Sequence, residues 1–476
     1  MNHLLMNHRW QRLGLLLSLV VAWVPQLIAQ EQPVTQDKPV VQEQLTLEQC
    51  REMALKYNKE LAASEQQARY ARYTKLSTRA LFLPNFSLTG TGLYSNIDGS
   101  FGLAGGNLPT FLPDASGQPL PNGGFAYFPG VEMNYKVGLV YMGGLTVEQP
   151  IYMGGKIRAA YQMARHGQLM AEANRTLTTT EVLLKTDRAY SLLVKAQEMQ
   201  EVARSYYALL KELMKDVESA HRHGLKPKND VLKVQVKLNE GELNIRKADN
   251  AMRLAQMNLC HCIGRPLLTE VRTTGRFPEV KVESQLQTSD ISLRPEVEIL
   301  DHQVEIARQQ LKMTRSEALP QVGVMGNYSY MHGVEMDHRT LFNKPQLTAM
   351  LNVQIPLFHF GEQANKIKAS KVQLQQVQLE RDNLNEQMLL ELAQAANNLD
   401  EAQLERDIAE RSLRQADENR RVSRSQYEAG MESLSDHLEA QALWQQAWQT
   451  HVESRYQLYL KYIEYLKAAG RLKVSE

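Results

Sequence analysis

The sequence is poor in the residues on which several classes of protein depend. It holds 3 cysteines in 476 residues, too few for a disulfide scaffold. Its 54 Lys and Arg are balanced by 53 Asp and Glu, so no excess of positive charge favours nucleic acid as a partner. Beyond the N-terminus, no apolar run approaches the roughly 20 residues of a membrane-spanning helix. These shortages exclude a membrane protein built from several spanning helices.

Motifs for catalysis and metal binding are also missing. We find no phosphate-binding loop, no nucleophile elbow and no coherent acid–base pair, so we predict no catalytic residue, no cofactor and no enzyme activity. Cys260, His261 and Cys262 suggest a metal site together with His221 and His223. A helix of roughly 40 residues would hold these two groups about 55–60 Å apart, so we predict a buried cysteine pair and no metal site.

Residues 1–29 have the order of a secretory signal peptide. Arg9 and Arg12 precede an apolar stretch over 13–24, and Ala29 suits the position before a cleavage site. A retained membrane anchor is disfavoured, because the stretch has about 12 residues and a span needs about 20. We therefore expect an exported chain whose residues 30–45 are a flexible N-terminal segment.

The most informative feature is an internal repeat. Four landmarks recur 206 positions later: Pro150 as Pro356, Gly155 as Gly361, Gly224 as Gly430, and Asp230 as Asp436. Glu60 and Pro84 recur 236 positions later as Glu296 and Pro320. The difference of 30 lies in a Gly/Pro-rich stretch, 96–130, with the composition of a surface loop. Constant offsets at several positions indicate one duplicated structural unit.

Each half contains a very long helical segment. Residues 156–223 hold one Gly and no Pro, and residues 362–429 hold neither. Each segment would form a helix about 100 Å long. Apolar residues seven apart, such as Leu177 and Leu184, favour coiled-coil packing against neighbouring helices. Shorter helices, expected over 46–80, 230–262, 293–319 and 436–469, would flank the long ones in pairs.

Four segments alternate apolar and polar residues with the period of a β-strand. The clearest is 346–357, where Leu347, Leu351 and Val353 share one face and polar residues the other. We predict strands at about 84–95, 133–150, 320–331 and 345–357, with a long loop at 96–132. The predicted domains are a first repeat (46–263), an equatorial linker (264–292), a second repeat (293–470) and a tail (471–476).

Strands with a wholly apolar face suit a lipid membrane. A soluble sheet packed on the helices is the alternative, but the helices are too long to cover four such strands. Strands that span lipid must close into a ring, and four strands cannot close. Three or more copies, with twelve or more strands, are therefore needed. The expected junctions between strands and helices are Pro84, Pro150, Pro320 and Pro356.

Together these features resemble the TolC-type outer-membrane efflux protein family. The most specific segment is 427–440, Tyr-Glu-Ala-Gly-Met-Glu-Ser-Leu-Ser-Asp-His-Leu-Glu-Ala, with a shorter echo at 224–232. The resemblance implies a mainly α protomer with a transmembrane β part, built from a duplicated helix–strand–strand–helix unit. It implies a homotrimer with a 12-stranded barrel in the outer membrane, continuous with a long α-helical barrel in the periplasm. The turns at Gly224 and Gly430 would be the periplasmic tips, where an adaptor docks.

The resemblance also implies a gate at these tips. Asp436 and Glu439 lie one turn apart, and around a three-fold axis they would form two carboxylate rings that attract cations. Asp230 and Tyr427 match positions that latch the closed tip in this family. The latch arginine is replaced here by Glu432, and Arg222 and Lys226 are possible substitutes. An alternative role for Asp230 and Asp436 is to cap the helices that follow the turns.

The function implied is a porin-like, passive exit duct for multidrug efflux or type I secretion from the periplasm of a Gram-negative bacterium. Its partners would be a periplasmic adaptor of the membrane-fusion type, an inner-membrane pump of the RND or ABC type, and outer-membrane lipid. The alternative is a periplasmic coiled-coil structural or adaptor protein. Dependence on detergent for extraction distinguishes the two.

Overall fold

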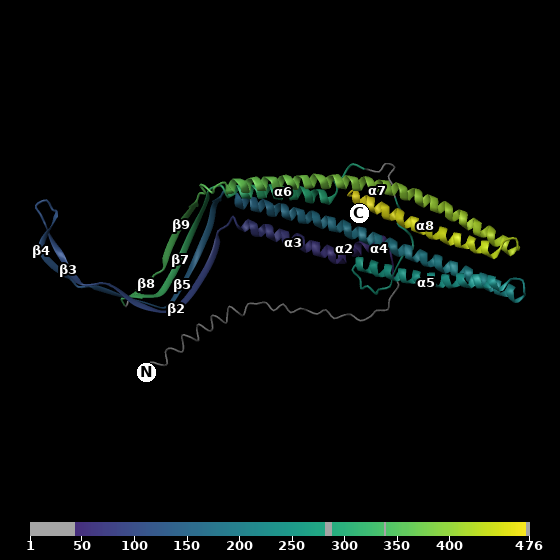
Figure 1. The fold of residues 1–476 in the computed structure, drawn as a ribbon, viewed down its shortest axis with the longest axis horizontal. Helices are drawn as coiled ribbons and strands as arrows, with labels where there is room; N and C mark the ends of the chain where they lie inside the picture. The colour runs from purple at the N-terminus through teal and green to yellow at the C-terminus, as the bar shows by residue number, and fades with distance from the viewer. Residues whose placement is uncertain (1–42, 281–287, 338, 473–476) are drawn as a thin grey trace, which may run out of the picture. The chain divides into compact units, whose positions relative to one another are not determined.

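The computed structural model describes residues 43–280, 288–337 and 339–472, and its elements repeat in the same order (Figure 1). The signal peptide expected at 1–29 lies outside the described residues. The first half comprises α2 (Leu47–Tyr57), α3 (Lys59–Ala80), β2 (Asn85–Leu103), β5 (Val131–Met153), α4 (Lys156–Arg222) and α5 (Lys228–Cys262). The second half comprises α6 (Pro295–Ser316), β7 (Gln321–Met336), β9 (Gln346–Gln354), α7 (Glu362–Glu428) and α8 (Leu434–Ala468). The duplicated helix–strand–strand–helix order is confirmed.

The long helices α4 and α7 have 67 residues each, as their lack of helix breakers predicts. Both begin after a glycine in the left-handed conformation, Gly155 at φ 90° and Gly361 at φ 83°. This backbone conformation is costly for other residues, so it defines where each helix begins. The helix expected over 46–80 is instead two helices, because Asn58 ends α2 and caps α3: its side chain accepts hydrogen bonds from the backbone N–H groups of Glu60 and Leu61.

The helices form a row in which α4 has neighbours on two sides. It packs against α3 and α5, stacked end to end, and against α6 and α8, also stacked (Figure 1). Helix α7 packs against α6 and α8. The order is therefore α3/α5, α4, α6/α8, α7, with α3/α5 and α7 at the two ends.

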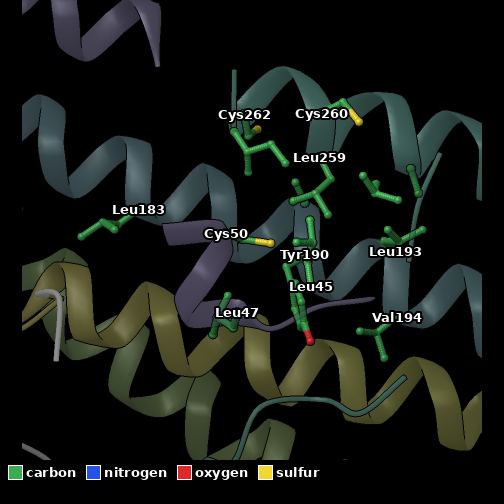
Figure 2. Close-up of a cluster of buried hydrophobic side chains, with 14 of the residues drawn as sticks. Leu45, Leu47, Cys50, Leu183, Tyr190, Leu193, Val194, Leu259, Cys260 and Cys262 are labelled. Carbon is green, nitrogen blue, oxygen red and sulfur yellow. The ribbon is translucent and has the colours of Figure 1, made fainter. Parts of the chain in front are cut away.

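The main hydrophobic core lies where α2, α4, α5 and α8 meet (Figure 2). Tyr190 and Leu193 from α4 pack there with Leu259 from α5, all at most 2% exposed. The three cysteines, Cys50, Cys260 and Cys262, are buried and unbridged beside them, as expected for the cysteine pair. Two short parallel strands, β1 (Glu43–Leu45) and β6 (Val271–Thr273), close this region. The segment expected to be flexible to residue 45 and the linker from 264 therefore contribute one strand each.

The four main strands form an antiparallel sheet in the order β2-β5-β7-β9, and β8 (Arg339–Leu341) pairs with the far end of β7. Among the described residues, β2 and β9 each pair on one side only. On β9 the apolar side chains predicted to face lipid are exposed, with Leu347 at 80% and Leu351 at 64%. No described helix combines the length and the apolar character that a membrane span requires.

The prediction of a long loop at 96–132 is wrong. Strands β2 and β5 extend into this stretch, and a separate hairpin of β3 (Gly106–Pro113) and β4 (Pro119–Phe128) lies between them. The Gly and Pro content of this stretch is typical of a loop. In a two-stranded hairpin, however, both strands are edge strands, where proline is tolerated although it lacks an N–H.

The expected proline junctions are found at three of four positions. Pro84 and Pro320 immediately precede β2 and β7, and Pro356 follows β9. Pro150 instead lies inside β5, next to a shift of register against β7. Such an irregularity accommodates a residue without an N–H inside a sheet.

Candidate functional site at the helical hairpin tips

Two helical hairpins, α4–α5 and α7–α8, end in turns of the same geometry. Gly224 and Gly430 have φ of 71° and 76°, as the left-handed turns predicted at these residues require. The next residue bonds back in the same way at each turn: Leu225 N–H donates to the Ala220 carbonyl, and Met431 N–H to the Gln426 carbonyl, both at 2.9 Å. The 206-residue repeat therefore reproduces the left-handed glycine and the hydrogen bond that follows it in both turns.

Asp230 and Asp436 do not cap the helices that follow these turns. The N-cap residues are Pro227 and Ser433, and the two aspartates lie three residues further on, in the first turn. The Ser433 side chain accepts from Asp436 N–H, and its hydroxyl donates to Asp436 Oδ2 at 2.8 Å. A carboxylate in the first turn is stabilised by the helix dipole, which is the structural role that both residues do have.

The residues predicted to form a gate are solvent-exposed. Asp436 and Glu439 are both exposed on α8, one helical turn apart. Their carboxylates therefore stay available to water and ions in the single chain. What they would face in an assembly depends on neighbouring copies.

Tyr427, one of the residues predicted to latch the tip, lies between the two hairpins. It packs from α7 against an apolar cluster formed by α4, α5 and the start of α8. Burial, and then the negative charges of Asp230 and Asp216, raise the pKa of the Tyr427 hydroxyl. Lys226, one of the two cations considered as substitutes for arginine, has its Nζ 4.9 Å from the centre of the Tyr427 ring. The cation thus comes from the turn of the other hairpin and contacts the ring face.

Further polar contacts join the hairpins. Lys233 Nζ donates to Ser435 Oγ at 3.0 Å, which connects α5 with α8. Arg424 on α7 pairs with Glu428 at 2.8 Å and lies 3.5 Å from Glu212 on α4. The residues of the two Arg424 ion pairs are more than half exposed, so each pair is weak by itself. These ion pairs lie at a small cleft, which we call the tip cleft, lined by Leu209, Glu212, Leu213, Asp216, Arg420, Arg424, Tyr427, Glu428, His437 and Gln441.

His437 is the residue of this site that sequence reasoning missed. It follows Asp436 directly, yet it is only 4% exposed. A signal was present: His437 lies three residues after Leu434 and next to Leu438, on the apolar face of the helix. A histidine on such a face, flanked by buried leucines, predicts a buried imidazole.

Comparison with known proteins defines the class to which this fold and site belong. The family model for outer membrane efflux proteins matches residues 50–265 and 289–471. The chain therefore belongs to the outer membrane efflux protein family, and the resemblance inferred from the sequence is confirmed. Membership means an outer-membrane protein of a Gram-negative bacterium and not an enzyme.

Individual relatives are more distant. The chain is 23% identical over 230 residues to alkaline protease secretion protein AprF of Pseudomonas aeruginosa, with 47% of each chain covered. It is 24% identical over 259 residues to Protein CyaE of Bordetella pertussis, covering 53% of this chain and 54% of CyaE. The chain spans about half the length of these curated relatives. The crystal structure of the Campylobacter jejuni CmeC outer membrane channel has the same fold, with a TM-score of 0.72 at 18% identity, covering 90% of this chain and 87% of CmeC.

Proposed function

We propose that the protein is a passive exit duct through which solutes leave the periplasm for the exterior, and that it works as a homotrimer. The observation that carries this proposal is a sheet with exposed apolar side chains and with two edges that no described strand pairs, joined to helices far too long to cover it. The family supports transport, and the geometry supports the assembly.

The sheet supports closure by copies of the same chain. Unpaired N–H and C=O groups at β2 and β9 cannot be left in lipid, where no water satisfies them. Three copies bring β9 of one chain beside β2 of the next and give a ring of twelve strands. A ring of this size is wider than one of eight strands, whose interior is filled by side chains.

The row of helices has matching open ends. Exposed apolar side chains lie along α7, and others lie along α3 and α5. Contact between α7 of one chain and α3/α5 of the next is head to tail, which closes into a ring when the rotation is right. The side chains concerned are Val372, Leu379, Leu404 and Ile408 on α7, and Tyr70, Tyr73, Leu232, Val236 and Leu254 on α3 and α5.

The tips supply the gate and the docking site in this proposal. Three copies of Asp436 and Glu439 give six carboxylates around the axis, which attract cations. The turns at Gly224 and Gly430 are the contact points for a periplasmic adaptor. An inner-membrane pump of the RND or ABC type provides the energy. The name of AprF, a protease secretion protein, supports a secreted polypeptide as one class of cargo, and the description of the family as outer membrane efflux proteins supports efflux as the other.

Extraction from cell envelopes tests the duct. We expect the protein to require detergent and to have the mass of a trimer by light scattering with the detergent mass subtracted. A soluble periplasmic monomer would instead support the alternative of a coiled-coil scaffold.

Single-channel recording tests the gate. We expect Asp436→Asn combined with Glu439→Gln to weaken cation preference and block by multivalent cations, because the ring charge is removed. The control, Glu52→Gln with Glu242→Gln, removes two exposed carboxylates from α2 and α5, away from the turn of α8, and should conduct like the parent. Unchanged selectivity in the first variant would reject the gate role and leave the duct intact.

A further inference from the structure

A buried imidazole lies at the contact between the two hairpins. His437 Nδ1 is 3.1 Å from Ser423 Oγ on α7, and Nε2 is 2.8 Å from Gln441 Nε2 one turn along α8. The ring is stacked on Tyr427, with centroids 4.9 Å apart and planes 4° from parallel. His437 therefore joins the start of α8 to the end of α7, and Tyr427 continues the contact to Lys226 of the other hairpin.

Hydrogen bonds satisfy both nitrogens of the neutral ring. Nδ1 faces the Ser423 hydroxyl and Nε2 faces the Gln441 amide, and each of these groups can donate or accept. A second proton would place a full positive charge on a buried ring, which costs free energy.

A carboxylate oxygen near the ring lacks a partner. Among the described residues, Glu432 Oε2 is buried without a hydrogen bond, and so is Gln441 Oε1. Glu432 lies in the turn before α8, and Gln441 lies near the start of that helix. Glu432 favours a charged imidazole, but burial of the ring has the larger effect and disfavours it.

We propose that His437 is a latch residue of the tip: the neutral ring holds α8 against α7 and the α4–α5 hairpin, and protonation releases it. This inference rests on the proposed function, because a latch implies a gate that opens. His437 directly follows Asp436 of the proposed carboxylate rings, and its titration makes closure of the tip dependent on pH.

The surroundings of the ring set the direction of this dependence. Burial has the largest effect and lowers the pKa of His437, Arg424 lowers it further, and Glu432 and Glu428 raise it. The charged groups around the ring are Glu212 and Asp216 from α4, Arg420, Arg424 and Glu428 from α7, and Glu432 from the turn.

Because the pKa of His437 is lowered in the closed tip, the ring binds a proton less readily there than in an opened tip. Closure is therefore fully favoured above a pH of about 6.5, the ordinary value for histidine, and is weakened as the pH falls below it. Acid should open the tip.

Conductance of the full-length protein in planar bilayers at pH 7.5 and pH 5.0 tests the latch. We expect the open probability of the parent to rise severalfold in acid. His437→Phe keeps an aromatic ring for the stack but cannot titrate, so this rise should disappear. His223→Gln, which removes an exposed histidine at the end of α4, is the matched control and should respond like the parent. Glu432→Gln should enlarge the acid response, because the closed tip loses a charge that favours the imidazolium and the pKa of His437 falls further there.

Hydrogen exchange separates failure of the latch from failure of the duct. Exchange of amides 434–441 in detergent, corrected for the intrinsic effect of pH, should accelerate in acid for the parent and not for His437→Phe. This readout needs no conductance, so it tests the latch even if no channel is recorded. An equal acid response of exchange in the parent and His437→Phe, or no response in the parent, would overturn the proposal.

Discussion

Asp187 connects three helices through its side chain. Its side chain is fully buried on α4, and both carboxylate oxygens accept from Arg51 on α2, at 2.8 and 2.5 Å. The hydroxyl of Tyr459 on α8 donates to the same carboxylate at 3.2 Å. The hydrogen bonds to Asp187 raise the pKa of Arg51, which therefore stays charged. A single carboxylate thus connects three helices of the main core.

Replacing Asp187 should destabilise the protein strongly. Asp187→Asn leaves the partly buried Arg51 without its counter-charge, and we expect a loss of about 3–5 kcal/mol. The measurement is thermal unfolding of the detergent-purified protein, followed by circular dichroism. Glu60→Gln breaks the half-exposed pair with Lys185 and is the control, with an expected change below about 1 kcal/mol. Equal melting of the two variants would contradict a special role for the buried pair.

At the scale of elements, Asn58 decides where one helix becomes two. Its side-chain oxygen accepts from the first turn of α3, and its Nδ2 donates to the Cys262 carbonyl at the end of α5, at 3.0 Å. The same residue therefore begins α3 and attaches it to the end of the neighbouring helix. This arrangement stacks α3 on α5, so that the two together flank the whole of α4.

Removing this cap should loosen the start of α3. Asn58→Ala loses the cap, at about 1 kcal/mol, and leaves the Cys262 carbonyl without its donor. We expect faster hydrogen exchange at the Glu60 and Leu61 amides. Asn58→Asp keeps the cap but cannot donate to Cys262, so it should protect these amides while still lowering the melting temperature. Equal protection in Asn58→Ala and the parent would show that packing alone defines the break.

At the scale of the whole molecule, the same feature appears twice: a sheet and a row of helices, each with two open ends. Both are joined through the same strand–helix junctions. Among the described residues, β2 and β9 each lack a partner strand on one side, and apolar side chains of α7 are exposed. In the proposed trimer, further copies would cover both.

Cysteine cross-linking across the proposed junction should measure the number of copies. We expect Thr348→Cys on β9, combined in turn with Ser87→Cys, Thr89→Cys or Thr91→Cys on β2, to give linked dimers and trimers in cell envelopes on non-reducing gels. The ladder should stop at three, because a closed ring has no free edge. Each single-cysteine variant is the control and should give no ladder. Bands beyond three would contradict the trimer.

The sequence by itself determined the repeat, the lengths of the two long helices and the turns that end them. These are local properties: a run without Gly or Pro propagates a helix, and a glycine at the same place in each half ends it. It also determined which strand residues are apolar, since alternation needs no knowledge of neighbours. Asp436, Glu439, Asp230 and Tyr427 were located correctly at the tip for this reason, and their roles in gating stay predictions.

Only the tertiary structure decided what is buried and what pairs. Arg51 lies 136 residues from Asp187 in the sequence, and no local pattern predicts their contact. The β3–β4 hairpin has the composition of a loop, and only pairing distinguishes the two. His437 is buried because Ser423 and Tyr427 of another helix cover it. Burial depends on the residues that pack against a side chain, and these residues come from other elements of the chain. Local sequence patterns therefore do not determine it.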